Sequence, residues 1–167
     1  VVETSGPANE FCGTAEPLAG AQSYVYDMGD ASLSGVPVPC GFAGNPDLWF
    51  EWTPDQSGSW RFSECQQVTA TVVVYEGSCD VLTPLACNSD FQFCAAQVEV
   101  HDMQAGTPYY VRVLGDPGPG QLDISFLAAQ RPDNDTCADA TPLSGNQIIG
   151  FDTDTATASG VSSFCNS

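Results

Sequence analysis

Hydrophobic and polar residues alternate along the chain in short stretches, and no stretch has the spacing of an amphipathic helix. Such alternation predicts strands at 21–27, 31–38, 47–54, 60–62, 69–75, 82–87, 97–101, 109–113 and 121–126. Glycine and proline separate these stretches, which is typical of turns. The pattern predicts an all-β fold, specifically a β-sandwich or jelly roll.

The stretch at 47–54 predicts a strand with two apolar faces. Leu48, Phe50 and Trp52 share one face of this strand. Trp49 lies on the other face and is too apolar to face water without cover. A sugar, a neighbouring module or a crossing loop would supply that cover.

The end of the sequence repeats its beginning. Residues 132–165 align without gaps on residues 7–40 at an offset of 125 (137 − 12 and 165 − 40), with 14 of 34 positions identical. Ordinary residue usage would give about two identities by chance. The chain therefore contains a complete module and the opening strands of a second, incomplete copy.

The repeat sets the expected domain boundaries. A complete module spans 9–129, a linker spans 130–133, and the partial second repeat spans 134–167. Residues 1–8, with Val1 and Val2, align with the end of a module and are predicted to be a tail, a linker or an inter-subunit strand.

Eight cysteines at patterned spacings predict disulfides and a secreted protein. Only Cys137 and Cys165 lie in the partial repeat, so they are expected to bond to each other and, by analogy, Cys12 to Cys40. The remaining four cysteines allow three pairings, and their connectivity stays open. The favoured pairs are Cys79–Cys87, which flank a short excursion, and then Cys65–Cys94.

The formal charge of −18, with no lysine and only three arginines, excludes nucleic acid and anionic lipid as plausible partners. The sequence contains no run of 18 apolar residues, so no membrane span is predicted. No signal peptide is visible, which suggests that one has been removed or that the chain is a mature fragment.

Candidate chemistry is sparse, and no catalytic residue is predicted. His101 is the only histidine and no Gly-x-Ser-x-Gly motif accompanies it, so a solvent-facing residue is favoured. Cofactors are not expected, and zinc is disfavoured because no CxxC pair occurs. Calcium is the remaining option, because carboxylates are plentiful in loops. The weak candidates are Asp27, Asp30, Asp47 and Asp90.

Glycans enter the predictions in two ways. Trp49, Trp60 and Tyr110 could form an aromatic platform for sugar rings, although strand aromatics more often fill a core. Asn134 begins a glycosylation sequon, and a stretch rich in threonine, alanine and serine could carry O-linked sugar. The candidates in that stretch are Thr153, Thr155 and Thr157.

Several motifs occur together in order: DxWFxWTP at 47–54, VYxGxC at 74–79, ACN at 86–88 and AGTxYYxRV at 105–113, with NDxCxxAxPL at 134–143. This set resembles the bacterial pre-peptidase C-terminal type of secreted repeat over 9–129 and 134–165. The resemblance implies a jelly-roll-like, non-catalytic module that is often found in tandem. Related repeats often carry two aspartates after the ACN, whereas this chain has Ser89 and Asp90.

The partial repeat leads to the favoured hypothesis of a structural subunit of an extracellular fibre or surface appendage. Residues 133–167 would then engage a neighbouring copy head-to-tail by strand addition. The alternative is a non-catalytic carbohydrate- or surface-binding accessory module of a secreted enzyme or adhesin. The expected inter-subunit residues, besides Val1 and Val2, are Ile148, Ile149, Phe151, Val161 and Phe164.

Overall fold

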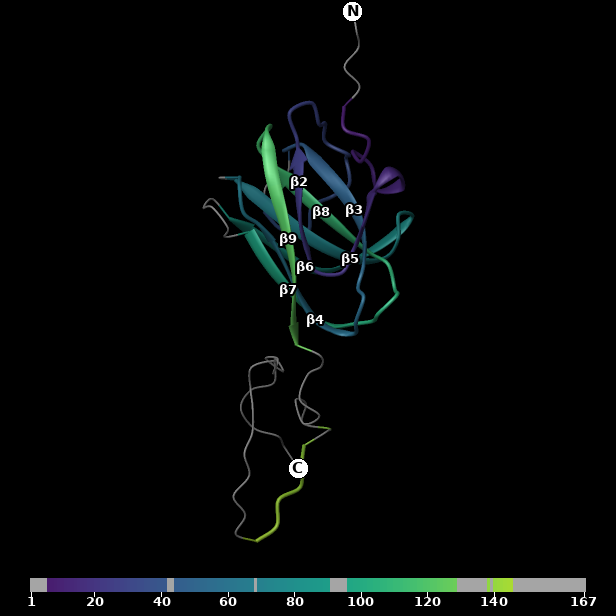
Figure 1. Cartoon of the computed structure of the whole chain (residues 1–167), viewed down its shortest axis with the longest axis vertical. Coiled ribbons are helices and arrows are strands. Elements are labelled where there is room, and N and C mark those ends of the chain that lie inside the picture. The colour runs from purple at the N-terminus through teal and green to yellow at the C-terminus, as the bar shows by residue number, and fades with distance from the viewer. Residues whose placement is uncertain are drawn as a thin grey trace, which may run out of the picture.

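The computed structural model describes residues 6–41, 44–67, 69–90, 96–128, 138 and 140–145 (Figure 1). A short 3-10 helix, η1 (Cys12–Thr14), precedes the strands in these residues. The strands are β1 (Glu16–Ala19), β2 (Gln22–Asp27), β3 (Asp47–Thr53), β4 (Gly58–Glu64), β5 (Ala70–Ser78), β6 (Val81–Asp90), β7 (Ala96–Met103), β8 (Tyr109–Gly115) and β9 (Pro119–Ala128). No helix within the described ranges is long and apolar enough to cross a membrane.

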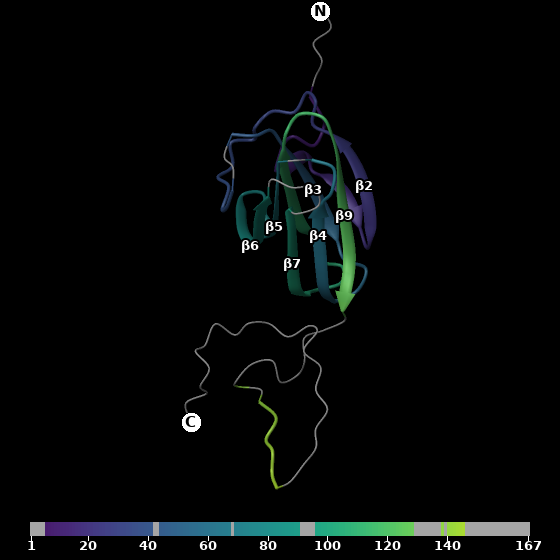
Figure 2. The ribbon, with the colours of Figure 1, turned by 90° about the vertical axis from the view of Figure 1, so that its left-hand side faces the viewer.

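The strands form two sheets that pack face to face as a sandwich (Figure 2). One sheet has the order β1-β3-β8-β5-β6 and the other the order β2-β9-β4-β7. From β2 to β9 the chain passes between the sheets in the double Greek key of a jelly roll. The predicted disulfide-stapled, all-β sandwich fold is therefore confirmed.

The core between the sheets uses the inward positions of both. Phe50 and Trp52 of β3 pack with Trp60 and Phe62 of β4, and all four side chains are fully buried. Trp52 meets Trp60 and Phe62 edge-on, at centroid distances of 4.8 and 5.0 Å. This geometry favours aromatic pairs beyond their burial. The predicted inward face of 47–54 is thus confirmed.

Two strand predictions are wrong. Residues 16–19 were not among the predicted strands but form β1, which pairs in parallel with β3. Residues 31–38 were expected to form a strand, but no strand is assigned there. Pro37 and Pro39 lack a backbone N–H, and Gly35 has a φ of +80°, so this stretch is poorly suited to a ladder.

We call residues 32–41 the crossing segment, because they pass over the outside of the five-stranded sheet (Figure 2). The backbone carbonyl of Ser32 accepts a hydrogen bond from the N–H of Asp47 on β3. The last residue, Gly41, lies so close to the Ser89 side chain on β6 that a Cβ would clash with it. Its φ of +75° also favours glycine.

Two predicted disulfides are wrong. Cys12 bonds to Cys79, at the tip of the β5–β6 hairpin, and Cys40 bonds to Cys87 on β6. A Cys79–Cys87 bond is ruled out because the strand from Val81 to Cys87 spans about 20 Å, whereas bonded cysteines need Cα atoms within about 7 Å. Cys12 and Cys40 each bond at one of these separated points, so neither reaches the other.

Each of the other two predicted disulfides includes at least one cysteine outside the described residues. Cys65 is disulfide-bonded, but Cys94 lies outside the described residues. Cys137 and Cys165 also lie outside them. Bonded cysteines in the described part agree with an oxidising compartment.

The chain enters and leaves the described sandwich at opposite ends. The described chain begins near the upper end of the sandwich in Figure 1, and β9 ends near the lower end. The turn between β8 and β9 lies at the upper end, so β9 runs the full length of the sandwich before the chain leaves it.

Candidate functional site

The outward face of the five-stranded sheet carries a second apolar cluster beneath the crossing segment. Trp49, Val73, Tyr75 and Leu114 form it, and all four side chains are buried. Trp49 stacks on Tyr75 with ring centroids 5.6 Å apart. Residues of η1 and the crossing segment pack against the cluster, so a crossing loop supplies the cover that Trp49 required.

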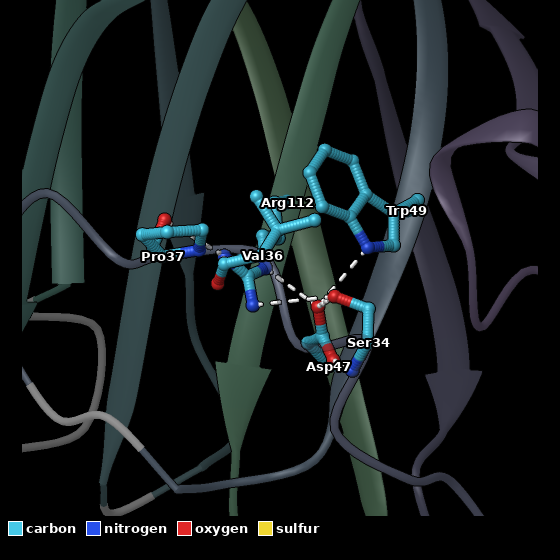
Figure 3. A network of polar contacts seen from close by, with 6 residues as sticks. All are labelled: Ser34, Val36, Pro37, Asp47, Trp49 and Arg112. Atoms are coloured by element: carbon cyan, nitrogen blue, oxygen red, sulfur yellow. Dashed lines mark hydrogen bonds and ion pairs between the residues drawn. The ribbon is translucent and has the colours of Figure 1, made fainter. Parts of the chain in front are cut away.

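A buried ion pair fixes the crossing segment to the sheet (Figure 3). The Nε of Arg112 on β8 lies 2.5 Å from Oδ2 of Asp47 on β3, and both side chains are fully buried. The backbone N–H and the hydroxyl of Ser34 each donate to the Asp47 carboxylate at 2.6 Å. Nη1 of Arg112 donates to the Val36 carbonyl at 3.0 Å. Both charges are therefore satisfied without water.

The same arginine is bordered by aromatic rings. Its guanidinium carbon lies 5.1 Å from the centroid of Trp49, within the range of a cation–π contact. Burial raises the pKa of the Tyr75 hydroxyl, and the neighbouring Arg112 opposes part of that rise. Tyr75 therefore stays neutral at physiological pH.

A pocket of about 300 Å³ opens between the crossing segment and the β5–β6 hairpin. Tyr75 contributes an aromatic ring to it, and the remaining lining is aliphatic. The Cys40–Cys87 bond joins the crossing segment to β6 beside the pocket and so limits how far the two walls separate. The lining residues are Val36, Pro37, Val38, Pro39, Tyr75, Leu82 and Pro84.

A polar pair lies next to Tyr75 on the same face. Tyr110 is the cross-strand partner of Tyr75 and is only half-buried. Its hydroxyl donates to Oε2 of Glu51 at 3.1 Å. Partial burial, and then the Glu51 carboxylate, raise the pKa of Tyr110. A half-exposed ring with an oriented hydroxyl and carboxylate can both stack on a ligand and hydrogen-bond to it.

The predicted aromatic platform is not formed. Trp49 and Trp60 are both fully buried, Trp49 under the crossing segment and Trp60 in the core. Of the three candidates, only Tyr110 has a partly accessible ring. The pocket was missed because residues 31–38 were predicted to form a strand, although Pro37 within it and Pro39 just after it indicated otherwise.

His101 was expected to face solvent but is half-buried. Its Nδ1 lies 2.9 Å from Oγ of Ser59 on β4. Ser59 is completely buried within the sheet, so a substrate carbonyl has no path to this hydroxyl. The Ser59–His101 pair is therefore a structural contact between β4 and β7.

The calcium candidates do not come together. No group of three or more histidine, cysteine, aspartate or glutamate side chains in the described ranges is placed to hold a metal ion. The Asp47 carboxylate is already held by Arg112 and Ser34, and Asp27 accepts a hydrogen bond from the backbone N–H of Gly29. Calcium binding stays a prediction.

The remaining predicted residues lie outside the described ranges. They include the glycosylation candidates Asn134, Thr153, Thr155 and Thr157. They also include the expected inter-subunit residues Val1, Val2, Ile148, Ile149, Phe151, Val161 and Phe164. Their predicted roles stay predictions.

No family model and no curated protein matches the sequence, so the resemblance to pre-peptidase C-terminal repeats stays a prediction. Similar solved structures include CsCBM6-3 from Clostridium stercorarium in complex with cellobiose, with 15% identity, a TM-score of 0.34, and 67% of this chain and 95% of that one covered.

The CBM36-1 domain of a multidomain xylanase from the hindgut metagenome of Trinervitermes trinervoides has 8% identity and a TM-score of 0.29, covering 62% of this chain and 94% of that one. The Podospora anserina GH26-CBM35 β-(1,4)-mannanase has 15% identity and a TM-score of 0.29, covering 66% and 28%. Likenesses at these TM-scores assign neither a ligand nor a function to this chain.

Proposed function

We propose that this chain is a non-catalytic, carbohydrate- or surface-binding accessory module of an extracellular protein. The observation that carries the proposal is the open pocket of about 300 Å³ on the outer face of the five-stranded sheet. Ligand sites begin near this volume and combine apolar walls with a few oriented polar groups.

The chemistry around the pocket suits a sugar ring or a polymer surface. Valine and proline side chains offer apolar contact above the buried Tyr75 ring, and the neighbouring Tyr110–Glu51 pair offers a hydroxyl and a carboxylate. The carbon-bound face of a sugar ring packs on such surfaces while its hydroxyls bond to polar groups at the edge.

The anchoring of the site also supports binding. The crossing segment is tied to β6 by the Cys40–Cys87 bond and to β3 and β8 by the buried ion pair. A wall held in place before the ligand arrives does not lose further conformational entropy on binding.

The test is affinity electrophoresis against soluble β-glucan, xylan and mannan, with pull-down on their insoluble forms. Pro84→Asp places a charge on the exposed rim of the pocket, and we expect about a tenfold weaker affinity, equivalent to about 1.4 kcal/mol. Val25→Asp is the matched control, because Val25 is an exposed apolar residue on β2 of the other sheet. Equal loss in both variants, or no retardation of the wild-type chain by any polysaccharide, would contradict the proposal.

A second candidate function is a structural unit of a tandem array or fibre. It is favoured by the repeat at offset 125 and by the opposite ends of the sandwich at which the described chain begins and β9 ends in Figure 1. Modules with this arrangement extend end to end. Electron microscopy of native material would then show filaments with an axial rise of roughly 35–50 Å per module, whereas dispersed particles would count against it.

A further inference from the structure

Residues 7–40 hold their place almost entirely through partners that come later in the chain. The side-chain amide of Asn9 donates a hydrogen bond to the backbone carbonyl of Trp49, and the backbone carbonyl of Asn9 accepts one from the N–H of Trp49. Cys12 and Cys40 bond to the β5–β6 hairpin. Ser34 donates to Asp47, and Leu18 enters the core. The segment supplies β1 and β2, and it forms one half of an interface whose other half is strands β3 to β9.

The second copy retains these contact-making positions. Fourteen positions are identical between 7–40 and 132–165, and they include residues that bond to or pack against the later strands in the first copy. The exposed Phe11 and Leu33 have changed to Thr136 and Ala158, and of the contact-making residues Met28 and Val38 have changed to Thr153 and Ser163. The retained contact residues are Asn134, Cys137, Leu143, Ser159, Val161 and Cys165, the counterparts of Asn9, Cys12, Leu18, Ser34, Val36 and Cys40.

The described part of the second copy shows the interface without its other half. Gly145 has a φ of +69°, close to the +61° of its counterpart Gly20, so the backbone conformation is repeated at this position. Leu143, however, is 67% exposed, whereas its counterpart Leu18 is 8% exposed. A leucine that the first copy buries against β3 lies in solvent in the second.

We propose that residues 132–165 belong to another sandwich and take the place there that residues 7–40 take here, against counterparts of β3-β8-β5-β6 and of β9. In that complex Cys137 bonds to a cysteine at the tip of the hairpin, as Cys12 does, and Cys165 bonds to a cysteine on the edge strand, as Cys40 does. The two cysteines therefore do not bond to each other. The expected Cys137–Cys165 bond predicted, by analogy, a Cys12–Cys40 bond, and the first copy does not contain that bond.

The linkage is an ordinary thiol oxidation. For each bond, two thiols lose two protons and two electrons to a disulfide oxidant such as oxidised glutathione, which is reduced to two thiols. Docking comes first, because it brings each pair of Cα atoms within the roughly 7 Å that a disulfide needs.

The first experiment traps free thiols of the native protein with N-ethylmaleimide at low pH and maps peptides without reduction. Pepsin suits this chain, because trypsin has few sites in it and Arg131 precedes a proline. We expect peptides joining Cys12 to Cys79 and Cys40 to Cys87. Cys137 and Cys165 should appear alkylated or bonded outside 132–165. A predominant peptide joining Cys137 to Cys165 would overturn the proposal.

A second experiment makes residues 132–165 compete with residues 7–40 for the later strands of the chain itself. Cys12→Ser with Cys40→Ser frees Cys79 and Cys87, and a glutathione redox buffer supplies the oxidant. We expect Cys137–Cys79 and Cys165–Cys87 peptides and disulfide-linked oligomers that grow with protein concentration.

The matched control adds Cys137→Ser and Cys165→Ser and should abolish the oligomers. Oligomers that persist in this control, or a Cys137–Cys165 bond in the first variant, would contradict the docking model. If the freed variant does not fold, mapping of the native chain still decides the question.

Discussion

The outer faces of the two sheets are built in opposite ways. On the five-stranded sheet, the outward residues of β3, β5 and β8 include Trp49, Val73 and Leu114, and the crossing segment covers them. On the four-stranded sheet, the outward residues are mostly polar and partly exposed, and Val25 is an isolated exception. They include Ser23, Arg61, Gln97, Glu99, Gln121 and Asp123.

Each face also holds an arginine–carboxylate pair, and the pairs differ in the same way. Arg112 and Asp47 are fully buried, whereas the side chains of Arg61 and Glu99 are 39% and 38% exposed. A buried charge that loses its partner is left in an apolar medium, while an exposed charge is simply hydrated. The same kind of contact therefore has a very different energetic weight on the two faces.

The largest expected effect comes from removing the buried cation. Arg112→Ala leaves the Asp47 carboxylate buried without a counter-charge and takes donors from the crossing segment. We expect the free energy of unfolding to fall by about 3–5 kcal/mol. Urea unfolding at pH 7 with disulfides intact measures this.

The control for that prediction is Arg61→Ala on the open face. Its exposed pair with Glu99 should contribute about 0–1 kcal/mol, and less at high salt. Similar losses in the two variants would show that the crossing segment does not exclude water from the first pair.

The second prediction concerns the disulfide that anchors the cover. Cys40→Ser with Cys87→Ser removes a bond between residues 47 apart in the sequence. We expect a loss of about 2–4 kcal/mol, mainly because the unfolded chain gains freedom. Thermal unfolding of the variant and of the reduced wild-type chain would measure it. Pocket-dependent binding should weaken as well, and unchanged binding would mean that the ion pair alone positions the pocket.

The strands were largely predictable because alternation reports burial directly. The two-faced strand at 47–54 even predicted that something must cover Trp49. The cover itself was missed, because Val36 and Val38 alternate with prolines and so mimic a strand. Alternation records which side chains are buried, and it does not record whether the backbone pairs with a neighbouring strand.

Neither the disulfides nor the pocket was predictable, for a different reason. Cys40 meets Cys87 only because the crossing segment passes over β8 and β5 to reach β6. The pocket likewise combines residues 36–39 with Tyr75 and Leu82 of the β5–β6 hairpin, which is a separate part of the chain. Spacing along a sequence carries little information about such long-range contacts.

The third prediction uses the second buried carboxylate, Glu64 at the end of β4. It has no arginine partner in the described structure and accepts hydrogen bonds from the Tyr26 hydroxyl and from backbone N–H groups, including that of Gln67. Burial, and then the charge of Glu64, raise the pKa of Tyr26 above its usual value.

Because the pKa of Tyr26 is raised in the folded chain, the contribution of its neutral hydroxyl to stability is fully present below pH 10. That contribution is lost as the pH rises above 10. The unfolded chain releases the proton first, so stability should fall by about 1.4 kcal/mol per pH unit above pH 10. Tyr26→Phe should remove this part of the alkaline slope, measured by urea unfolding between pH 8 and 11. An unchanged slope would mean that Tyr26 ionises equally in both states.

The smallest effect compares one residue type on the two faces. Val36 is half-buried in the crossing segment, and Val25 is 64% exposed on β2. Val36→Ala should cost about 1 kcal/mol, because roughly one buried CH₂ equivalent is lost. Val25→Ala should stay within about 0.5 kcal/mol of the wild-type chain. Because both changes delete the same atoms, the difference between the two urea midpoints measures how much the burial of Val36 in the crossing segment contributes to stability. A larger loss at Val25 would show that the polar face is itself covered in solution, which the openness of the four-stranded sheet argues against.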